Sequence, residues 1–209
     1  MCALTDIEST WEKRLNITTA GRDDLTADRY HHPYEPTPYR VLLRLADSGY
    51  IGEGDVVLDY GCGKGRVDFF LSHHTGASTI GIEYDERMLD FALANKKSSP
   101  AGKKVELVLT SAEEYELPHN VNRCYFFNPF SAEILKSVIS RILDSFYACP
   151  REILLFFYYP SDEYVGYLMT VDELEFYDDI PCDDLFDGDV KRERILVFSL
   201  PDYSSFGDE

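Results

Sequence analysis

The stretch VVLDYGCGKGR, from Val56 to Arg66, decides the fold of this chain. It begins with an apolar run rich in β-branched residues, which predicts a buried strand. Glycines at alternate positions then predict a tight loop, because glycine accepts positive φ and lets a ligand approach the main chain. The amphipathic continuation from Val67 to Leu71 predicts a helix whose first turn has free N–H groups. We therefore expect a cofactor loop at the carboxyl end of a strand, where open α/β sheets bind ligands.

Two acids indicate which cofactor this loop binds. The loop departs from the dinucleotide fingerprint G-x-G-x-x-G, because Arg66 stands where the third glycine belongs, and the phosphate-binding G-x-x-x-x-G-K-[ST] is absent. Asp59 lies close to the first glycine and would repel a pyrophosphate. S-adenosylmethionine (SAM) carries a sulfonium and an ammonium group, so an acid beside the loop favours it. The next predicted strand, 78–83, ends in Glu83, which can accept hydrogen bonds from both ribose hydroxyls.

The segment from Val57 to Gly65 resembles the first motif of class I SAM-dependent methyltransferases, and Gly81 to Asp85 resembles their second motif. The resemblance extends over roughly residues 39–200. It implies an α/β, single-domain, Rossmann-like fold: a mainly parallel seven-stranded sheet, helices on both faces and an antiparallel last strand. It also implies SAM as the cofactor, bound by Asp59, Gly61, Cys62, Gly63, Gly65, Glu83, Tyr84, Ser111, Ala112 and Asn128. Ser111 replaces an acid that often meets the adenine amino group in this family, and Glu113 is a possible substitute.

Length and composition fit one cytoplasmic domain. The 209 residues are 44% apolar, and no apolar run approaches the roughly 18 residues of a membrane span. The first thirty residues contain acids and no apolar segment of a signal peptide. Five cysteines without C-x-x-C spacing predict free thiols in a reducing compartment. The formal net charge of −18 makes nucleic acid an unfavourable partner.

Hydrophobic periodicity predicts alternating helices and strands, hence a parallel sheet with right-handed crossovers. The helices are expected over 6–16, 39–50, 86–97, 133–148 and a short stretch within 160–169. Met88, Leu89, Ala92 and Leu93 should face inward. Further strands are expected over 104–109, 123–127, 152–158, 174–180 and 195–200, the last two separated by an acidic loop.

Residues 1–38 precede the methyltransferase domain proper, which we place at 39–209. They comprise an amphipathic helix and a loop, 21–38, that we assign to covering the cofactor or substrate; loops of this length are often functional. The segment from Tyr34 to Tyr39 has two interpretations. It resembles a pre-core element that folds over the cofactor in some protein-lysine methyltransferases, or it is a proline-punctuated helix entry capped by Thr37, which we favour.

The acceptor site is expected beyond the fourth strand, at Asn128, Pro129 and Phe130. These residues resemble part of a motif of amino-group methyltransferases. The Asn128 oxygen and the Pro129 carbonyl could accept hydrogen bonds from an amine, and Phe130 could form a wall; otherwise Asn128 turns the chain and Phe130 is core. Candidate substrate contacts are Tyr34, Tyr158 and Tyr159. No metal site is expected, because adjacent histidines point apart.

We therefore predict a SAM-dependent methyltransferase acting on an amine of a protein side chain or a small molecule. The alternatives are a SAM-binding module without activity and a nucleotide-dependent oxidoreductase. The stretch 161–193 predicts a cationic acceptor, because acids attract cations, although they could equally serve only solubility. Its twelve Asp and Glu residues stand at 162, 163, 172, 173, 175, 178, 179, 183, 184, 187, 189 and 193. The sequence leaves the oligomeric state open.

Overall fold

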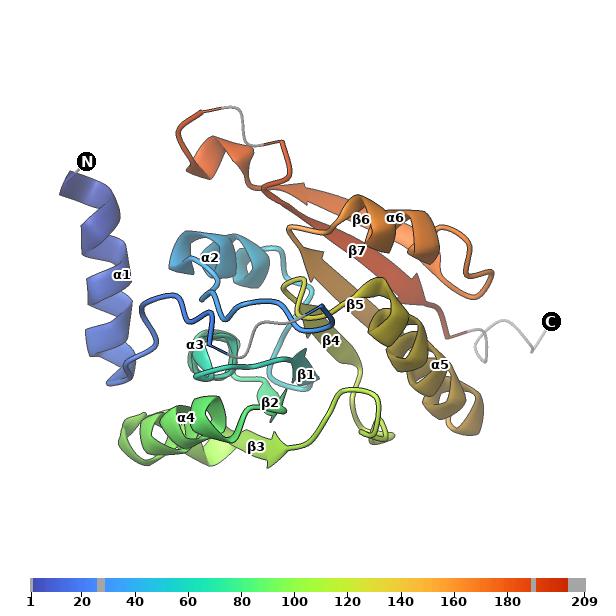
Figure 1. Cartoon of the computed structure of the whole chain (residues 1–209), viewed down its shortest axis with the longest axis horizontal. Coiled ribbons are helices and arrows are strands. Elements are labelled where there is room, and N and C mark those ends of the chain that lie inside the picture. Colours follow the sequence, from blue (N-terminus) through green and yellow to red (C-terminus); the bar gives the residue numbers. More distant parts are fainter. Residues whose placement is uncertain (1, 26–28, 189–190, 203–209) are drawn as a thin grey trace.

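The computed structural model describes residues 2–25, 29–188 and 191–202, with side chains from residue 7 onward. Seven strands form one sheet in the order β3-β2-β1-β4-β5-β7-β6 (Figure 1). Strands β1 to β5 are parallel, and β7 runs antiparallel to both of its neighbours. The predicted fold class, including the antiparallel last strand, is confirmed. The strands are β1 (Val56–Tyr60), β2 (Ser78–Glu83), β3 (Val105–Leu109), β4 (Arg123–Phe126), β5 (Ile153–Tyr158), β6 (Glu175–Pro181) and β7 (Arg194–Leu200).

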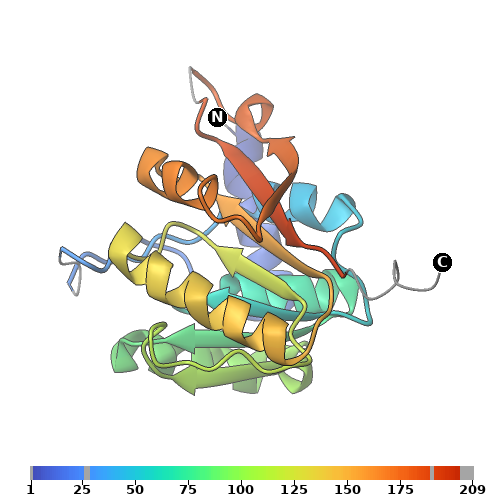
Figure 2. The same cartoon turned by 90° about the vertical axis from the view of Figure 1, so that its right-hand side faces the viewer.

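Helices cover both faces of the sheet (Figure 2). Helices α5 and α6 pack on one face, whereas α1, α2 and α3 lie over the other. The helices are α1 (Cys2–Leu15), α2 (Tyr39–Asp47), α3 (Arg66–Thr75), α4 (Glu86–Ser98), α5 (Ala132–Ala148) and α6 (Asp162–Leu168), with short 3-10 turns η1 (Gly102–Lys104) and η2 (Asp183–Leu185). None of the helices in the described ranges is long and apolar enough to cross a membrane.

Burial follows the predicted hydrophobic pattern in most elements. Strand β5 is buried along its whole length, as expected for an apolar strand covered on both faces. In α4, the residues Met88, Leu89 and Ala92 are buried, but the prediction for Leu93 was wrong: its side chain is 37% exposed. A helix that packs on one side buries only a stripe of its surface. Four inward positions within six residues would need a wider stripe, so Leu93 lies at its exposed edge.

The chain between α1 and α2 crosses the carboxyl edge of the sheet, where β1 and β4 end (Figure 1). The predicted role of Thr37 as a helix cap was wrong. Pro38 occupies the cap position of α2 without a side-chain hydrogen bond, and the Thr37 hydroxyl instead contacts the Tyr125 hydroxyl on β4 at 3.0 Å. Thr37 therefore fastens the crossing segment to the sheet. We call residues 17–37 the strap; its residues 26–28 lie outside the described part.

Candidate functional site

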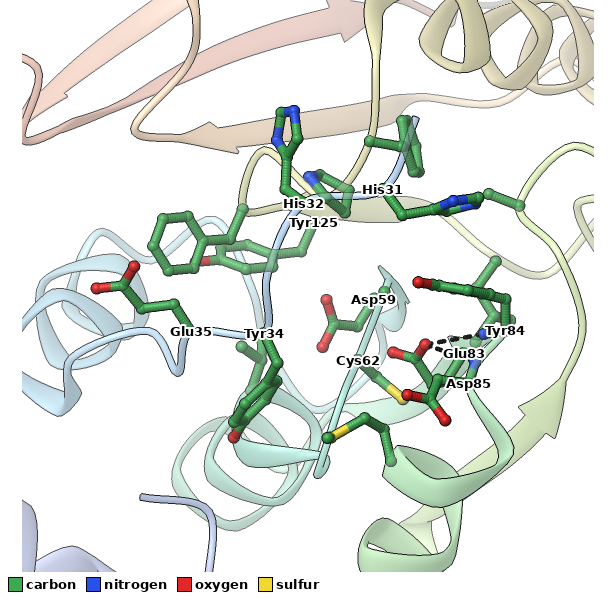
Figure 3. Close-up of a pocket in the computed structure, with 18 of the residues that line it drawn as sticks. His31, His32, Tyr34, Glu35, Asp59, Cys62, Glu83, Tyr84, Asp85 and Tyr125 are labelled. Atoms are coloured by element: carbon green, nitrogen blue, oxygen red, sulfur yellow. Dashed lines mark hydrogen bonds between the residues drawn. The ribbon is translucent and has the colours of Figure 1, made fainter. Parts of the chain in front are cut away.

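A cavity lies at the carboxyl edge of β1, β2 and β4, beneath the strap (Figure 3). The strap contributes seven consecutive lining residues, 31–37. The sheet side contributes residues from the loop after β1, the end of β2, the segment after β3 and the segment after β4. Five segments that are separate in sequence thus enclose one space at the edge where open α/β sheets bind ligands.

The glycine loop after β1 has the conformation that its sequence predicts. Gly61 and Gly63 have φ values of 78° and 53°. A Cβ added to Gly63 would lie 2.3 Å from the Tyr34 ring, and one added to Gly61 would lie 2.9 Å from Pro129. Side chains at these positions would therefore displace both the strap and the segment after β4.

Glu83 holds this loop in place from β2. Its Oε2 accepts from the Gly63 N–H, and its Oε1 accepts from the N–H groups of Tyr84 and Asp85, all at 2.9 Å. A carboxylate has about four lone-pair sites, so one site on Oε2 is left for a ligand hydroxyl. Burial raises the pKa of the Glu83 carboxyl, and the three backbone donors offset part of that rise.

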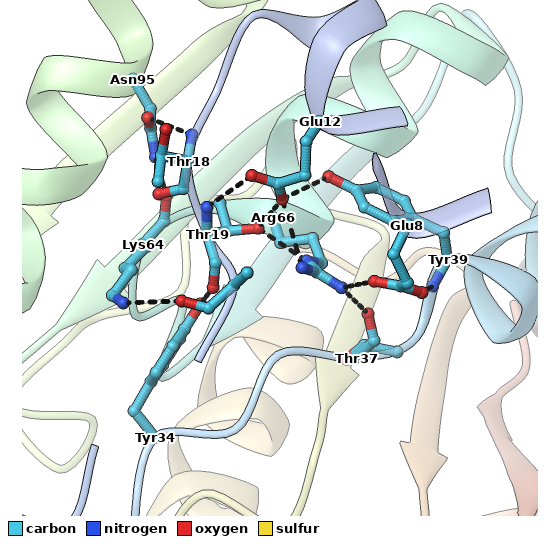
Figure 4. A network of polar contacts seen from close by, with 11 residues as sticks. Glu8, Glu12, Thr18, Thr19, Tyr34, Thr37, Tyr39, Lys64, Arg66 and Asn95 are labelled. Atoms are coloured by element: carbon cyan, nitrogen blue, oxygen red, sulfur yellow. Dashed lines mark hydrogen bonds and ion pairs between the residues drawn. The ribbon is translucent and has the colours of Figure 1, made fainter. Parts of the chain in front are cut away.

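Arg66, the first residue of α3, binds the N-terminal segment (Figure 4). Its guanidinium forms ion pairs with Glu8 at 2.5 Å and Glu12 at 3.2 Å on α1. It also donates to the Thr19 hydroxyl at 2.7 Å and to the Thr37 carbonyl at 3.1 Å. One buried cation therefore connects the glycine loop to α1 and to both ends of the strap.

The strap is also anchored on both sides of the cavity. On the cofactor-loop side, the Tyr34 hydroxyl donates to the Thr19 carbonyl at 2.6 Å. The His31 ring stacks on Tyr84 with centroids 4.1 Å apart. On the β4 side, His32 Nδ1 lies 2.7 Å from the carbonyl oxygen of Asn128, and its backbone N–H donates to Pro129 at 3.1 Å.

The segment after β4 differs from the sequence-based expectation in one respect. The Pro129 carbonyl, expected to face an acceptor amine, accepts from the strap instead. Asn128 has a φ of 43°, and its side-chain Oδ1 is buried without a hydrogen-bond partner within the described chain. Phe130 is buried and lines the cavity, so it belongs to both the core and the cavity wall.

The predicted site residues divide into two groups. Those that line the cavity are Tyr34, Asp59, Gly61, Cys62, Glu83, Tyr84, Ala112, Pro129 and Phe130. Gly63, Gly65, Ser111 and Asn128 are not among the lining residues, whereas Glu113, the suggested substitute for Ser111, is. Tyr158 and Tyr159 lie outside the lining; the Tyr158 hydroxyl donates to Glu193 at 2.5 Å.

The acidic stretch 161–193 is partly paired within the protein. Asp184 forms an ion pair with Arg44, and Asp179 forms one with Arg194. Asp189 lies outside the described residues. The remaining negative surface is therefore smaller than the sequence count suggests.

Sequence reasoning missed the roles of Glu8, Glu12, Arg66, His31 and His32. Arg66 and its two glutamates are 58 and 54 positions apart, and no local pattern connects them. The histidine pair was considered only as a metal site, and the described residues contain no group of three or more His, Cys, Asp or Glu that could hold a metal.

Comparison with known proteins relates this chain to methyltransferases. Residues 57–149 match the family model described as a methyltransferase domain. A protein-lysine N-methyltransferase of Saccharolobus islandicus is 25% identical over 114 residues, which are 54% of this chain and 71% of that protein. Together with the fold, these matches support a SAM-dependent methyltransferase of the class I kind.

Solved structures share the fold of this methyltransferase. An RNA methyltransferase from Salinibacter ruber in complex with S-adenosyl-L-homocysteine superposes with a TM-score of 0.59 at 17% identity, covering 80% of this chain and 94% of that one. A human methyltransferase 10 domain containing protein superposes with a TM-score of 0.63 at 12% identity, and the alignment covers 97% of both chains. A SAM-dependent O-methyltransferase from Thermotoga maritima superposes with a TM-score of 0.60 at 14% identity. The alignment covers 80% of this chain and 67% of that one. Relatives named for different acceptors thus share one fold.

The residues of the cavity fit SAM. Asp59, Glu83 and Asp85 present carboxyl groups to it. Arg66 is the one Arg or Lys among the described residues that line it, and its guanidinium already binds Glu8 and Glu12. Such a lining suits the sulfonium and ammonium of SAM better than a pyrophosphate. SAM supplies the methyl group, and the protein supplies position and electrostatics.

Proposed function

We propose that this methyltransferase acts on an amine, and that the acceptor is a lysine side chain of a protein. Asn128 carries the proposal. Its Oδ1 is a buried acceptor with no donor in the described chain, directly after β4 and next to two residues that line the cavity. A buried amide oxygen without a partner costs about 1–3 kcal/mol, so a donor from the substrate is a natural partner for it.

The charge of the cavity supports a cationic acceptor. Glu35 and Glu113 line it together with the three carboxyl groups named above. A negative lining attracts lysine-rich segments and repels a phosphate backbone. The match to a protein named as a protein-lysine N-methyltransferase points in the same direction.

RNA is the alternative acceptor, because the Salinibacter ruber neighbour is named an RNA methyltransferase. The net charge of −18 and the acidic lining argue against RNA here. A small-molecule amine could donate a hydrogen bond to the Asn128 Oδ1 just as a lysine side chain could.

The test uses radiolabelled SAM with three acceptor pools: a protein lysate, total RNA and a mixture of small amines. We expect label in protein, recovered after hydrolysis as methylated lysine. Label confined to RNA would overturn the proposal of an amine acceptor, and label confined to small amines would overturn the protein acceptor.

The contribution of Asn128 is tested with glycine, because alanine would be strained at a φ of 43°. We expect Asn128→Gly to lower kcat about tenfold to a hundredfold with SAM affinity unchanged, as for a lost hydrogen bond in the transition state. Asn16→Gly is the matched control, since Asn16 also has positive φ and lies at the end of α1. An equal loss of SAM affinity in Asn128→Gly would place this residue in the cofactor site instead.

A further inference from the structure

Asp68 is a fully buried carboxyl group inside α3 that the methyltransferase motifs do not use. Its side chain is 0% exposed, and neither of its oxygens meets a hydrogen-bond donor within the described chain. The nearby Thr79 hydroxyl lies 3.5 Å from the main-chain oxygen of Asp68 and also contacts the Ser72 hydroxyl at 3.3 Å. An ionised carboxylate in this position would be unsolvated and unpaired, which is a costly state.

The position of Gly81 brings Asp68 next to Asp59. Gly81 on β2 is the register partner of Asp59 on β1. A Cβ on Gly81 would lie 2.8 Å from Asp68 Oδ2 and 2.8 Å from Cys62 Sγ. Because Gly81 has no side chain, the Asp68 carboxyl enters the space above it and comes near enough to the carboxyl of Asp59 for a hydrogen bond between the two. Two carboxyl groups can form that bond only with a proton between them.

Every titratable group that faces this pair is an acid. They are Glu83 from β2, Cys62 from the glycine loop, Tyr125 from β4 and Tyr34 from the strap. Arg66, on the same helix as Asp68, is turned toward Glu8 and Glu12. Among the described groups that act on the pair there is no cation, and only the Thr79 hydroxyl and a backbone N–H favour the ionised form of Asp68, so one proton is the group that stabilises the pair.

We propose that Asp59 and Asp68 share one proton in the cofactor-free enzyme, and that binding of SAM releases this proton to solvent. The O–H bond of the shared proton breaks, the proton passes to the buffer, and two carboxylates remain beside the cavity. Asp68 is then a positioning residue that acts through Asp59. The proposal rests on SAM as cofactor and is independent of which acceptor the enzyme uses.

Burial of both carboxyl groups, and the repulsion of Asp59 by Asp68, give the pair its affinity for a proton. Burial raises the pKa of the Asp68 carboxyl from its ordinary value near 3.8 to about 7, and burial together with Asp68 raises the pKa of Asp59. SAM brings two positive groups into the cavity that Asp59 lines, and nearby positive charge favours the ionised form of a carboxyl. S-adenosylhomocysteine lacks the sulfonium charge, so it should release fewer protons than SAM.

The first measurement is the number of protons released on binding, from calorimetry at about pH 6.5 in buffers of different ionisation enthalpy. We expect wild type to release between about 0.3 and 1 proton per bound SAM, and fewer with S-adenosylhomocysteine. If one proton is released for each SAM bound, the affinity for SAM rises about tenfold for each unit increase in pH. Asp68→Asn mimics the protonated residue and should release fewer protons than wild type on binding SAM, with Asp59 the one member of the pair that still titrates. The exposed Asp144→Asn on α5 removes the same charge elsewhere and should behave as wild type.

The second measurement needs no cofactor. The pKa of the Asp68 carboxyl is about 7 in the folded state, against an ordinary value near 3.8. Between these two pH values the folded state therefore binds more protons than the unfolded state. Wild type therefore loses stability as pH rises through this window, and Asp68→Asn loses less, because Asp59 is then the one member of the pair that titrates. The Tm of Asp68→Asn relative to wild type should rise by at least about 3 °C between about pH 5 and about pH 8.

Two results would overturn the proposal: wild type that releases no proton on binding SAM, or release that persists unchanged in Asp68→Asn. A Tm difference independent of pH would do the same, since a purely structural role of Asp68 moves Tm equally at all pH values. If Asp68→Asn does not fold, the wild-type comparison of SAM with S-adenosylhomocysteine still decides, because equal proton release would contradict the charge mechanism.

Discussion

Replacing Arg66 by methionine should release the N-terminal segment from the domain. Methionine keeps much of the length of the side chain but removes the charge and all donors. The change leaves Glu8 and Glu12 without their cation and removes one hydrogen bond each from Thr19 and Thr37. These are the contacts that join α1 and the strap to the glycine loop.

The magnitude follows from burial. Arg66 is 4% exposed, and the Glu12 side chain is 15% exposed, so their pair counts as buried. Breaking a buried ion pair by removing one partner costs roughly 3–5 kcal/mol. Glu8 is 32% exposed and can be solvated, which places the expected loss near the lower end. For a chain of this size, roughly 3 kcal/mol corresponds to a Tm lower by about 6–12 °C.

Trp11 makes the release of α1 visible. It is the one tryptophan of the chain, it is buried, and its ring packs edge-on against Phe70 of α3 with centroids 4.8 Å apart. In Arg66→Met we expect a red-shifted emission at temperatures where far-ultraviolet circular dichroism still reports a folded domain. SAM should also bind more weakly, because the strap lines the cavity.

Two further variants control this experiment. Arg66→Lys keeps the charge but not the fork of donors, so it should restore part of the lost stability. Arg192→Met removes an exposed arginine that pairs at 3.7 Å with the fully exposed Asp162, and should change stability by less than about 0.5 kcal/mol. The reasoning is refuted if Arg66→Met keeps the wild-type Tm and Trp11 emission, because the buried pairs would then contribute nothing to docking.

Three other predictions concern the cofactor site and the acceptor. Glu83→Gln should weaken SAM binding about tenfold to a hundredfold, because its amide NH₂ cannot accept from the Gly63 N–H; calorimetry showing wild-type affinity would contradict this role. Tyr34→Phe keeps the ring over Gly63 and loses only the bond to Thr19, so it should retain more SAM affinity than Tyr34→Ala; equal affinities would mean that the ring contributes nothing. For the acceptor identified, kcat/KM should fall steeply with ionic strength if the acidic surface steers a cation, and a flat response would rule steering out.

The sequence predicted the parts of the fold that depend on local patterns. The strand–loop–helix unit around Gly63 and the second strand ending in Glu83 lie where their spacing placed them, and element ends differ by a few residues at most except at the start of α1. The ion pairs of Arg66 with Glu8 and Glu12 could not be predicted from the sequence, because both acids lie more than fifty positions away. Asp68 was read only as a polar position of an amphipathic helix. Its role depends on the empty space above Gly81, which exists only once β1, β2 and α3 are assembled.

The distribution of charge within the cavity bears on a difficulty of the proposed lysine acceptor. A lysine must lose its proton before it attacks a methyl group, and nearby carboxylates favour the charged form. The carboxyl groups of Asp59, Glu83 and Asp85 belong to β1 and β2 and the loops after them (Figure 3). The β4 side is lined instead by Phe127, Pro129 and Phe130. An amine that enters on the β4 side leaves water among apolar rings, which lowers its pKa, while the positive charge of bound SAM lowers it further. On the proposed function, the carboxyl groups of Asp59, Glu83 and Asp85 stabilise the cofactor, and the apolar residues after β4 lower the pKa of the acceptor amine.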